Sequence, residues 1–124
     1  MVLVDDDVPY LEALARLIEK ADLGVDVVKA TNGVDALIEI GRVRPALIAL
    51  DFRLPDLNAL QVIERLLEPG RELDAELLVV TGGIDDKEQE KLRKLGVRVI
   101  VNKADGAQAV IEAIRQALRR RKAA

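Results

Sequence analysis

The sequence of 124 residues contains no cysteine and no histidine. Without cysteine the chain has no disulfide bonds and no thiolate chemistry. Without histidine it lacks the commonest general base and the commonest nitrogen ligand of metal ions. Aromatic residues make up only 2% of the chain, namely Tyr10 and Phe52, so we expect no stacking platform for single-stranded nucleic acid. Any site chemistry must therefore come from carboxylates, hydroxyls, amines and the backbone.

Long apolar runs and a strong net charge are also missing. No apolar run approaches the roughly 20 residues of a membrane span, and no charged-then-apolar leader precedes Val2. The 19 basic and 22 acidic residues leave a net charge of −3, which does not point to a nucleic-acid partner. We expect a soluble cytoplasmic protein that contacts neither membrane nor nucleic acid directly. The basic residues of segment 119–124 indicate either a solvated helix end or the start of a linker.

The apolar residues of the chain form a pattern in which predicted strands alternate with predicted helices. Short apolar runs predict strands at 2–4, 25–28, 47–50, 77–80 and 97–101. Helical spacing of apolar residues covers 11–18, 36–40, 59–67, 85–95 and 107–118. We expect Asp7 to cap the first helix and Leu23-Gly24 to close it. This alternation predicts a single α/β domain over residues 1–124, with a parallel sheet covered by helices on both faces.

Polar side chains follow four of the five predicted strands. Asp5 and Asp6 follow the first, Asp51 the third, Thr81 the fourth and Lys103 the fifth. The carboxyl ends of parallel strands meet at one edge of the sheet, where ligands bind. Two carboxylates 4 Å apart repel by about 4 kcal/mol at an effective dielectric of 20, so a divalent cation such as Mg²⁺ is expected between them.

A phosphoryl group would suit this predicted set of residues. Its oxygens could be held by the metal, by the Lys103 ammonium and by the Thr81 hydroxyl. Because the chain has no cysteine or histidine, the candidate nucleophile is a carboxylate, which can form an acyl phosphate.

The chain resembles the receiver domains of two-component response regulators over essentially its whole length. The acidic pair comes after strand one, Asp51 is followed by Leu54-Pro55, and Thr81 and Lys103 come after strands four and five. The resemblance implies a flavodoxin-like (CheY-like) doubly wound fold. Its five-stranded parallel sheet has the strand order 2-1-3-4-5, with five helices on both faces.

The resemblance also implies roles for individual residues in metal binding. Asp51 would accept a phosphoryl group from a sensor histidine kinase or a phosphotransfer protein. Asp6 and Asp51 would bind Mg²⁺ directly with the backbone carbonyl of Arg53, while Asp5 would assist through water.

Two further residues lie near the predicted site. The Arg53 side chain would either control water access to the phosphoryl group or be merely solvated. We expect Asp56 to be a loop residue near the site.

Further roles concern the phosphoryl group and the signal. Lys103 and the backbone N–H of Gly82 would contact phosphoryl oxygens. Thr81 would move toward the group and report its presence to the surface formed by helix 85–95, strand 97–101 and helix 107–118. An output domain or a target protein would read this surface, which is also compatible with a homodimer.

Four positions depart from the family pattern, one of them being Asn102, which occupies a strand-end position that is usually apolar. Ala59 replaces the usual glycine, and we expect Asn58 to remake the turn in a left-handed conformation. Ala104 replaces the proline that usually forms a cis peptide with Lys103, so this bond is either trans with a shifted loop or cis and held by the site. Ile100 replaces the aromatic side chain that usually rotates on activation.

These departures keep other functions open. The chain would be a phosphoacceptor switch rather than an enzyme, or a receiver-like interaction module that acts without phosphorylation. An aspartyl phosphatase would need a second aspartate two residues after Asp51, where this chain has Arg53. A flavodoxin-like cofactor carrier would need a phosphate loop after the first strand, where this chain has acids.

Overall fold

The computed structural model describes residues 1–70 and 73–123, which form one parallel sheet flanked by helices. The strands pair in the order β2-β1-β3-β4-β5, which confirms the predicted topology. Their bounds are β1 Val2–Val4, β2 Val28–Ala30, β3 Leu47–Leu50, β4 Glu76–Thr81 and β5 Val99–Asn102. Every pairing is parallel, so all five carboxyl ends lie at one edge of the sheet.

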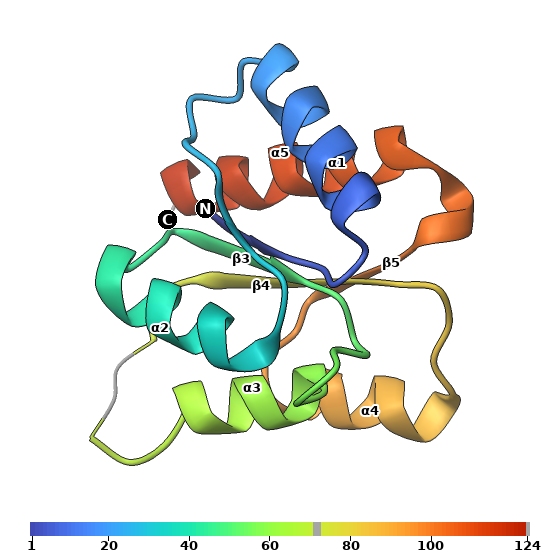
Figure 1. Cartoon of the computed structure of the whole chain (residues 1–124). Helices are drawn as coiled ribbons and strands as arrows, with labels where there is room; N and C mark the ends of the chain where they lie inside the picture. Colours follow the sequence, from blue (N-terminus) through green and yellow to red (C-terminus); the bar gives the residue numbers. More distant parts are fainter. Residues whose placement is uncertain (71–72, 124) are drawn as a thin grey trace.

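Five α-helices cover the two faces of the sheet (Figure 1). Helices α1 and α5 pack on one face, and α2, α3 and α4 pack on the other (Figure 1). Their bounds are α1 Val8–Lys20, α2 Gly33–Val43, α3 Ala59–Leu66, α4 Asp86–Lys94 and α5 Ala107–Ala123, with a short 3₁₀ helix at Lys103–Asp105. No helix in these described segments has the length and apolar character needed to cross a bilayer.

The continuous apolar runs of the strands follow from burial on both faces. In β3, Leu47 and Ala49 join the core beneath α1 and α5, while Ile48 and Leu50 join the core beneath α2, α3 and α4. All four side chains are buried. Each side chain of β3 therefore meets a packed helix layer, whichever face of the sheet it points to.

The two edge strands differ from their predicted bounds. Strand β2 begins at Val28 rather than residue 25, because its only partner in the sheet is β1 and the pairing starts at Val2. Strand β5 begins at Val99 rather than residue 97. The backbone N–H of Val97 instead donates to the carbonyl of Leu92 at 3.1 Å and closes the end of α4.

Two chain reversals also differ from the predictions. Asp7 caps α1 as predicted, but the helix ends at Lys20 rather than at Leu23-Gly24, and Asp22 takes a left-handed φ of 51°. Asn58 has an extended conformation with φ −91°, so the predicted left-handed turn there is wrong. Its side chain instead accepts the N–H of Gln61 in a capping box, which requires an extended N-cap residue.

The basic residues near the end of the chain belong to α5. Arg120, Arg121 and Lys122 lie in its last turn. Arg120 and Arg121 reach Glu76 and Asp74 at 3.6 and 3.2 Å. These residues are thus helical and two of them are paired with acids, while the start of a linker stays a prediction; residue 124 of the predicted tail lies outside the described residues.

Candidate functional site

The predicted site residues converge at the carboxyl edge of the sheet. The backbone N–H of Asp51 donates to the carbonyl of Val4 at 2.9 Å, and that of Asp5 donates to the carbonyl of Ala30 at 3.1 Å. These bonds continue the strand pairing one residue past β1 and β3. The positions of the two acids are therefore set by the sheet itself.

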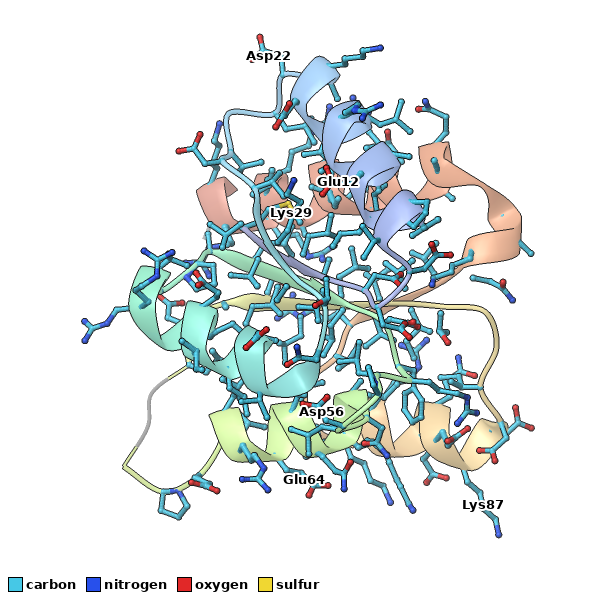
Figure 2. The ribbon with its side chains drawn as sticks, viewed as in Figure 1. Glu12, Asp22, Lys29, Asp56, Glu64 and Lys87 are labelled. Atoms are coloured by element: carbon cyan, nitrogen blue, oxygen red, sulfur yellow. The ribbon has the colours of Figure 1, made fainter. Side chains whose placement is uncertain are left out.

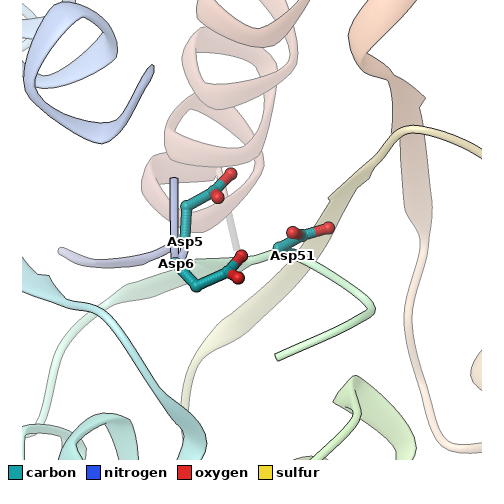
Figure 3. A group of neighbouring side chains, drawn as sticks. All are labelled: Asp5, Asp6 and Asp51. Carbon is teal, nitrogen blue, oxygen red and sulfur yellow. The ribbon is translucent and has the colours of Figure 1, made fainter. Parts of the chain in front are cut away.

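Three carboxylates form the centre of the site. One oxygen from each of Asp5, Asp6 and Asp51 lies within 4.8 Å of the others. Figure 3 shows the three side chains grouped together. Asp5 and Asp51 are buried, whereas Asp6 is exposed. Burial raises the pKa of Asp51, and the charge of Asp5 raises it further, although Lys103 lowers it in part.

Lys103 is the cation that the site provides. Its Nζ lies 2.7 Å from Oδ2 of Asp5 and 3.4 Å from Oδ2 of Asp51. Burial alone would lower the pKa of Lys103, but the hydrogen bond to Asp5 and the charge of Asp51 raise it above its ordinary value. A single ammonium faces three carboxylates, so the cluster retains a surplus of negative charge.

The donor set fits a hard divalent cation. All the clustered ligand atoms are carboxylate oxygens, and the sequence contains no cysteine or histidine to favour a softer metal. The surplus negative charge on partly buried groups is the kind of repulsion that such an ion relieves. Asp5, Asp6 and Asp51 could therefore hold Mg²⁺.

The Lys103–Ala104 peptide is trans, which selects the first of the two predicted alternatives. The Asn102 side chain accepts the backbone N–H of Ala104 at 2.9 Å and starts a single 3₁₀ turn over Lys103–Asp105. This local cap shapes the loop that begins with Lys103.

Thr81 ends β4 between the strand that carries Asp51 and the strand that precedes Lys103. Its side chain is buried, and Oγ1 accepts the backbone N–H of Gly83 at 3.3 Å. Gly82 lies between them and is exposed. The hydroxyl and this small loop lie at the end of β4, two strands away from the strand that precedes the acidic pair.

Three neighbours of the site were absent from the sequence prediction or underrated by it. Lys103 Nζ lies 4.6 Å from the centre of the Tyr10 ring, and Tyr10 could have been suspected from its place in the first turn of the helix that follows the acidic pair. Glu88 Oε1 lies 3.3 Å from a guanidinium nitrogen of Arg53. Asp56, expected only to be a nearby loop residue, accepts backbone N–H groups of another helix, which no local sequence signal indicates.

The Arg53 side chain is largely exposed but not free. Besides its contact with Glu88, its guanidinium lies 5.3 Å from the centre of the Phe52 ring. The Phe52 side chain is fully buried, so it provides a fixed face for this contact. Arg53 therefore lies between the Asp51 segment and the start of α4.

The comparisons of this chain with known proteins agree on one protein family. The model of the response regulator receiver domain matches residues 1–115. RegA of Rhodobacter capsulatus, a photosynthetic apparatus regulatory protein, is 35% identical over 82 residues, which are 66% of this chain and 42% of RegA. DivK of Brucella anthropi, a polar-differentiation response regulator, is 25% identical over 118 residues, which are 95% of this chain and 94% of DivK. The chain thus spans less than half of RegA and nearly all of DivK.

Solved structures show the same fold. A CheY-like response regulator receiver domain protein from Methanospirillum hungatei JF-1 has a TM-score of 0.85 at 23% identity, over 98% of this chain and 94% of that one. The signal receiver domain of a response regulator from Bermanella marisrubri has a TM-score of 0.81 at 29% identity, over 94% and 95%. With its sheet order, its acidic edge and the family match over residues 1–115, this chain belongs to the receiver-domain family of two-component response regulators.

Proposed function

We propose that this chain is a Mg²⁺-dependent phosphoacceptor in two-component signalling, with Asp51 as the residue that is modified. The observation that carries the proposal is the group of three carboxylates beside Lys103, at an edge formed by the sheet. Asp51 follows β3, the strand next to β4 with its Thr81, and its Oδ2 lies 3.4 Å from Lys103 Nζ, so it is the acid that lies between the acidic pair and the other predicted phosphoryl ligands. A carboxylate oxygen of Asp51 would form a bond to the phosphorus atom while the bond from phosphorus to the donor breaks. The donor would leave with the electrons of that bond, and Asp51 would carry an acyl phosphate.

Asp5, Asp6, Asp51 and the backbone carbonyl of Arg53 are the proposed ligands of the metal. When bound, Mg²⁺ supplies positive charge that offsets the repulsion between carboxylates and phosphoryl oxygens. In the protein itself, the bonds of Asp5 and Asp51 to the neighbouring strands hold the acids in place before any ligand arrives. We assign Asp5 a contact through water, because its Oδ2 is already bound to Lys103 at 2.7 Å.

Lys103, Thr81 and the N–H of Gly82 are the proposed phosphoryl ligands. Lys103 Nζ is 3.4 Å from Asp51 Oδ2, so it lies beside the place where the new oxygens would be. The Thr81 hydroxyl, whose oxygen accepts the Gly83 N–H, would donate its own O–H to a phosphoryl oxygen. Since Thr81 ends β4, which pairs with β5, a movement of Thr81 toward the phosphoryl group would be transmitted toward the α4–β5–α5 surface.

Receiver domains act with histidine kinases and with output domains or target proteins, and they are generally signalling modules rather than enzymes. We propose that residues 1–124 are one such domain in the cytoplasm, phosphorylated by a sensor histidine kinase or a phosphotransfer protein. The α4–β5–α5 surface is the proposed contact for an output domain, a target protein or a second copy. We assign no direct contact with nucleic acid or membrane to this domain.

A specific observation favours a second candidate function. Ile100 lies half-buried against the core beneath α2, α3 and α4, where it has no ring to exchange between two positions. A receiver-like module that binds its partner without phosphorylation would need no such exchange. This alternative predicts partner binding that a phosphodonor does not change.

Intact mass after incubation with acetyl phosphate separates the two candidates. Wild type should gain a phosphoryl mass in the presence of Mg²⁺ and lose the gain with EDTA, whereas Asp51→Asn should gain none. Asp7→Asn is the matched control, because it makes the same chemical change at an acid whose side chain caps α1 instead of joining the three carboxylates. Wild type that gains no mass, or Asp51→Asn that gains as much as wild type, would contradict the proposed function.

A further inference from the structure

The segment between Asp51 and α3 is attached to the start of α2 by one side chain. The Asp56 carboxylate accepts the backbone N–H of Gly33 at 2.7 Å, that of Val34 at 2.9 Å and that of Leu57 at 2.9 Å. Figure 2 labels Asp56 between α2 and α3. A carboxylate 22 residues downstream of Val34 therefore caps α2.

The start of α2 has two separable caps. The first turn of a helix leaves N–H groups without partners inside the helix, and a negative charge is favoured there. Asp56 takes the N–H groups of Gly33 and Val34, while the Asn32 side chain takes that of Asp35 at 2.8 Å. Only the Asp56 cap reaches the segment that follows Asp51.

An apolar contact reinforces this attachment. A Cβ placed on Gly33 would lie 2.8 Å from Cβ of Leu57, which is closer than real side chains approach. Gly33 is buried and Leu57 is half-buried. The segment thus contacts α2 by hydrogen bonds from Asp56 and by close packing from the next residue.

The same segment is fixed at its other end by the sheet and by α3. Asp51 donates its N–H to the carbonyl of Val4, and Ala59 donates its N–H to the carbonyl of Phe52 at 2.8 Å. Arg53 and Asn58 form an isolated antiparallel bridge. Arg53, whose carbonyl is a proposed metal ligand, therefore lies in a short loop held closed at its base and held to α2 at its tip.

We infer that Asp56 is a positioning residue for the metal site. By holding residues 56 and 57, the tip of the loop, against α2, it keeps the Arg53 backbone in one arrangement beside Asp51 before Mg²⁺ arrives. A site that is already ordered binds without the entropy loss of ordering the loop. This inference rests on the proposed Mg²⁺ site, and it concerns a residue that touches neither the metal nor the phosphoryl group.

Isothermal titration calorimetry with MgCl₂ tests the inference on three proteins. Wild type should bind Mg²⁺, and Asp56→Ala should bind about tenfold more weakly, as is usual when a group that orients a metal ligand is removed. Asn32→Ala is the matched control, because it removes the other cap of the same helix and leaves the Asp56 contacts in place. Its affinity for Mg²⁺ should stay within twofold of wild type.

Amide hydrogen exchange without metal gives an independent readout. In Asp56→Ala the amides of residues 52–57 should exchange faster than in wild type, while those of β1 and β3 should be unchanged. In Asn32→Ala the segment 52–57 should exchange as in wild type. Asp56→Glu should restore part of the protection, because a carboxylate can still reach the end of α2.

The outcomes separate this inference from the proposed function. If wild type binds Mg²⁺ and Asp56→Ala binds equally well, the positioning role is wrong. Equal weakening in Asp56→Ala and Asn32→Ala would also overturn it, because the effect would then follow from the loss of α2 stability. Wild type that does not bind Mg²⁺ would instead contradict the proposed metal site itself.

Discussion

At the scale of single residues, the negative charge of Asp51 is unfavourable in the folded chain. Asp51 is buried beside Asp5, and both conditions raise the pKa of Asp51 despite the nearby Lys103. The ionised form of Asp51, which the proposed phosphoryl transfer needs, is therefore less favourable in the folded chain than in the unfolded one. Folding positions this charge at the expense of stability.

The first prediction follows from that unfavourable charge. Without metal at pH 7, Asp51→Asn should unfold at a higher temperature than wild type, because it removes one of the three carboxylates. A gain on the order of 1 kcal/mol would raise the Tm by roughly 4 °C. Adding Mg²⁺ should raise the Tm of wild type more than that of Asp51→Asn. Thermal unfolding followed by circular dichroism would contradict this account if Asp51→Asn were the less stable protein in EDTA.

Asp56 shows the opposite electrostatic behaviour. Its hydrogen bond from Gly33, followed by those from Val34 and Leu57, holds the pKa of Asp56 below its ordinary value. The ionised form of Asp56 is therefore more favourable in the folded chain than in the unfolded one. Its contribution to stability is present above the unfolded value of about 3.9 and is lost as the pH falls through the lower folded value.

Comparison of wild type with Asp56→Asn at several pH values tests this behaviour. The variant should be the less stable protein at pH 7, and the difference should shrink as the pH falls below about 4. Urea unfolding at each pH measures the difference in the free energy of unfolding. A difference that stayed constant from pH 7 to pH 3 would show that the charge of Asp56 contributes nothing.

At the scale of elements, two glycines of α2 face different surroundings. Gly33 begins the helix against Leu57, whereas a Cβ on Gly41 would meet nothing within 4 Å. The same substitution by alanine should therefore have opposite effects at the two positions. Helix propensity alone would make both changes favourable.

We predict that Gly33→Ala destabilises the fold by about 1–3 kcal/mol, as overpacking usually does. Gly41→Ala should stabilise it by about 0.5–1 kcal/mol, because alanine loses less backbone entropy in a helix. The midpoints of urea unfolding give both values. Gly33→Ala with the stability of wild type would mean that the close contact with Leu57 is absent in solution.

Helix α4 is held mainly by polar contacts. Leu92 is its only fully buried residue, whereas α3 buries Ala59, Val62, Ile63 and Leu66. Its start depends on the capping box between Asp85 and Glu88. Arg53 contacts the same Glu88 Oε1 that accepts the Asp85 N–H. An element with so little buried apolar surface is the one that opens most easily.

Hydrogen exchange of the unmodified chain should show this difference between the helices. We expect the amides of α4 to exchange at least tenfold faster than those in the middle of α3, because local opening of α4 exposes less apolar surface. Mass spectrometry of peptides from the two helices measures both rates. Equal protection would contradict the weak packing of α4.

At the scale of the whole molecule, the sheet could be predicted because its strands are buried on both faces. Runs such as Leu47–Leu50 stand out from the flanking polar residues, and the chain order of strands and helices then determines where each strand ends. The site followed from this edge together with the resemblance to receiver domains. The structure brings one oxygen of each predicted acid within 4.8 Å of the others and places Lys103 Nζ 2.7 Å from Asp5 and 3.4 Å from Asp51.

The features that escaped prediction depend on partners distant in the sequence. The start of β2 is set by the start of β1, and the role of Asp56 is set by Gly33 and Val34. Local propensity alone does not contain the information on these two partners. The cap at Asn58 is the exception, because Gln61 lies only three residues later and forms a capping box that the sequence itself contains.

The most direct measurement compares amide NMR spectra of the chain with Mg²⁺ alone and after phosphorylation by acetyl phosphate. The account predicts shifts at Thr81, Gly82 and Lys103 and a connected set of shifts over α4 and β5, with none of these in Asp51→Asn. Glu12 and Lys29, an exposed ion pair at 2.9 Å between α1 and β2, should stay unchanged (Figure 2). Spectra that are identical before and after addition of acetyl phosphate would contradict the claim that Asp51 is a phosphoryl switch.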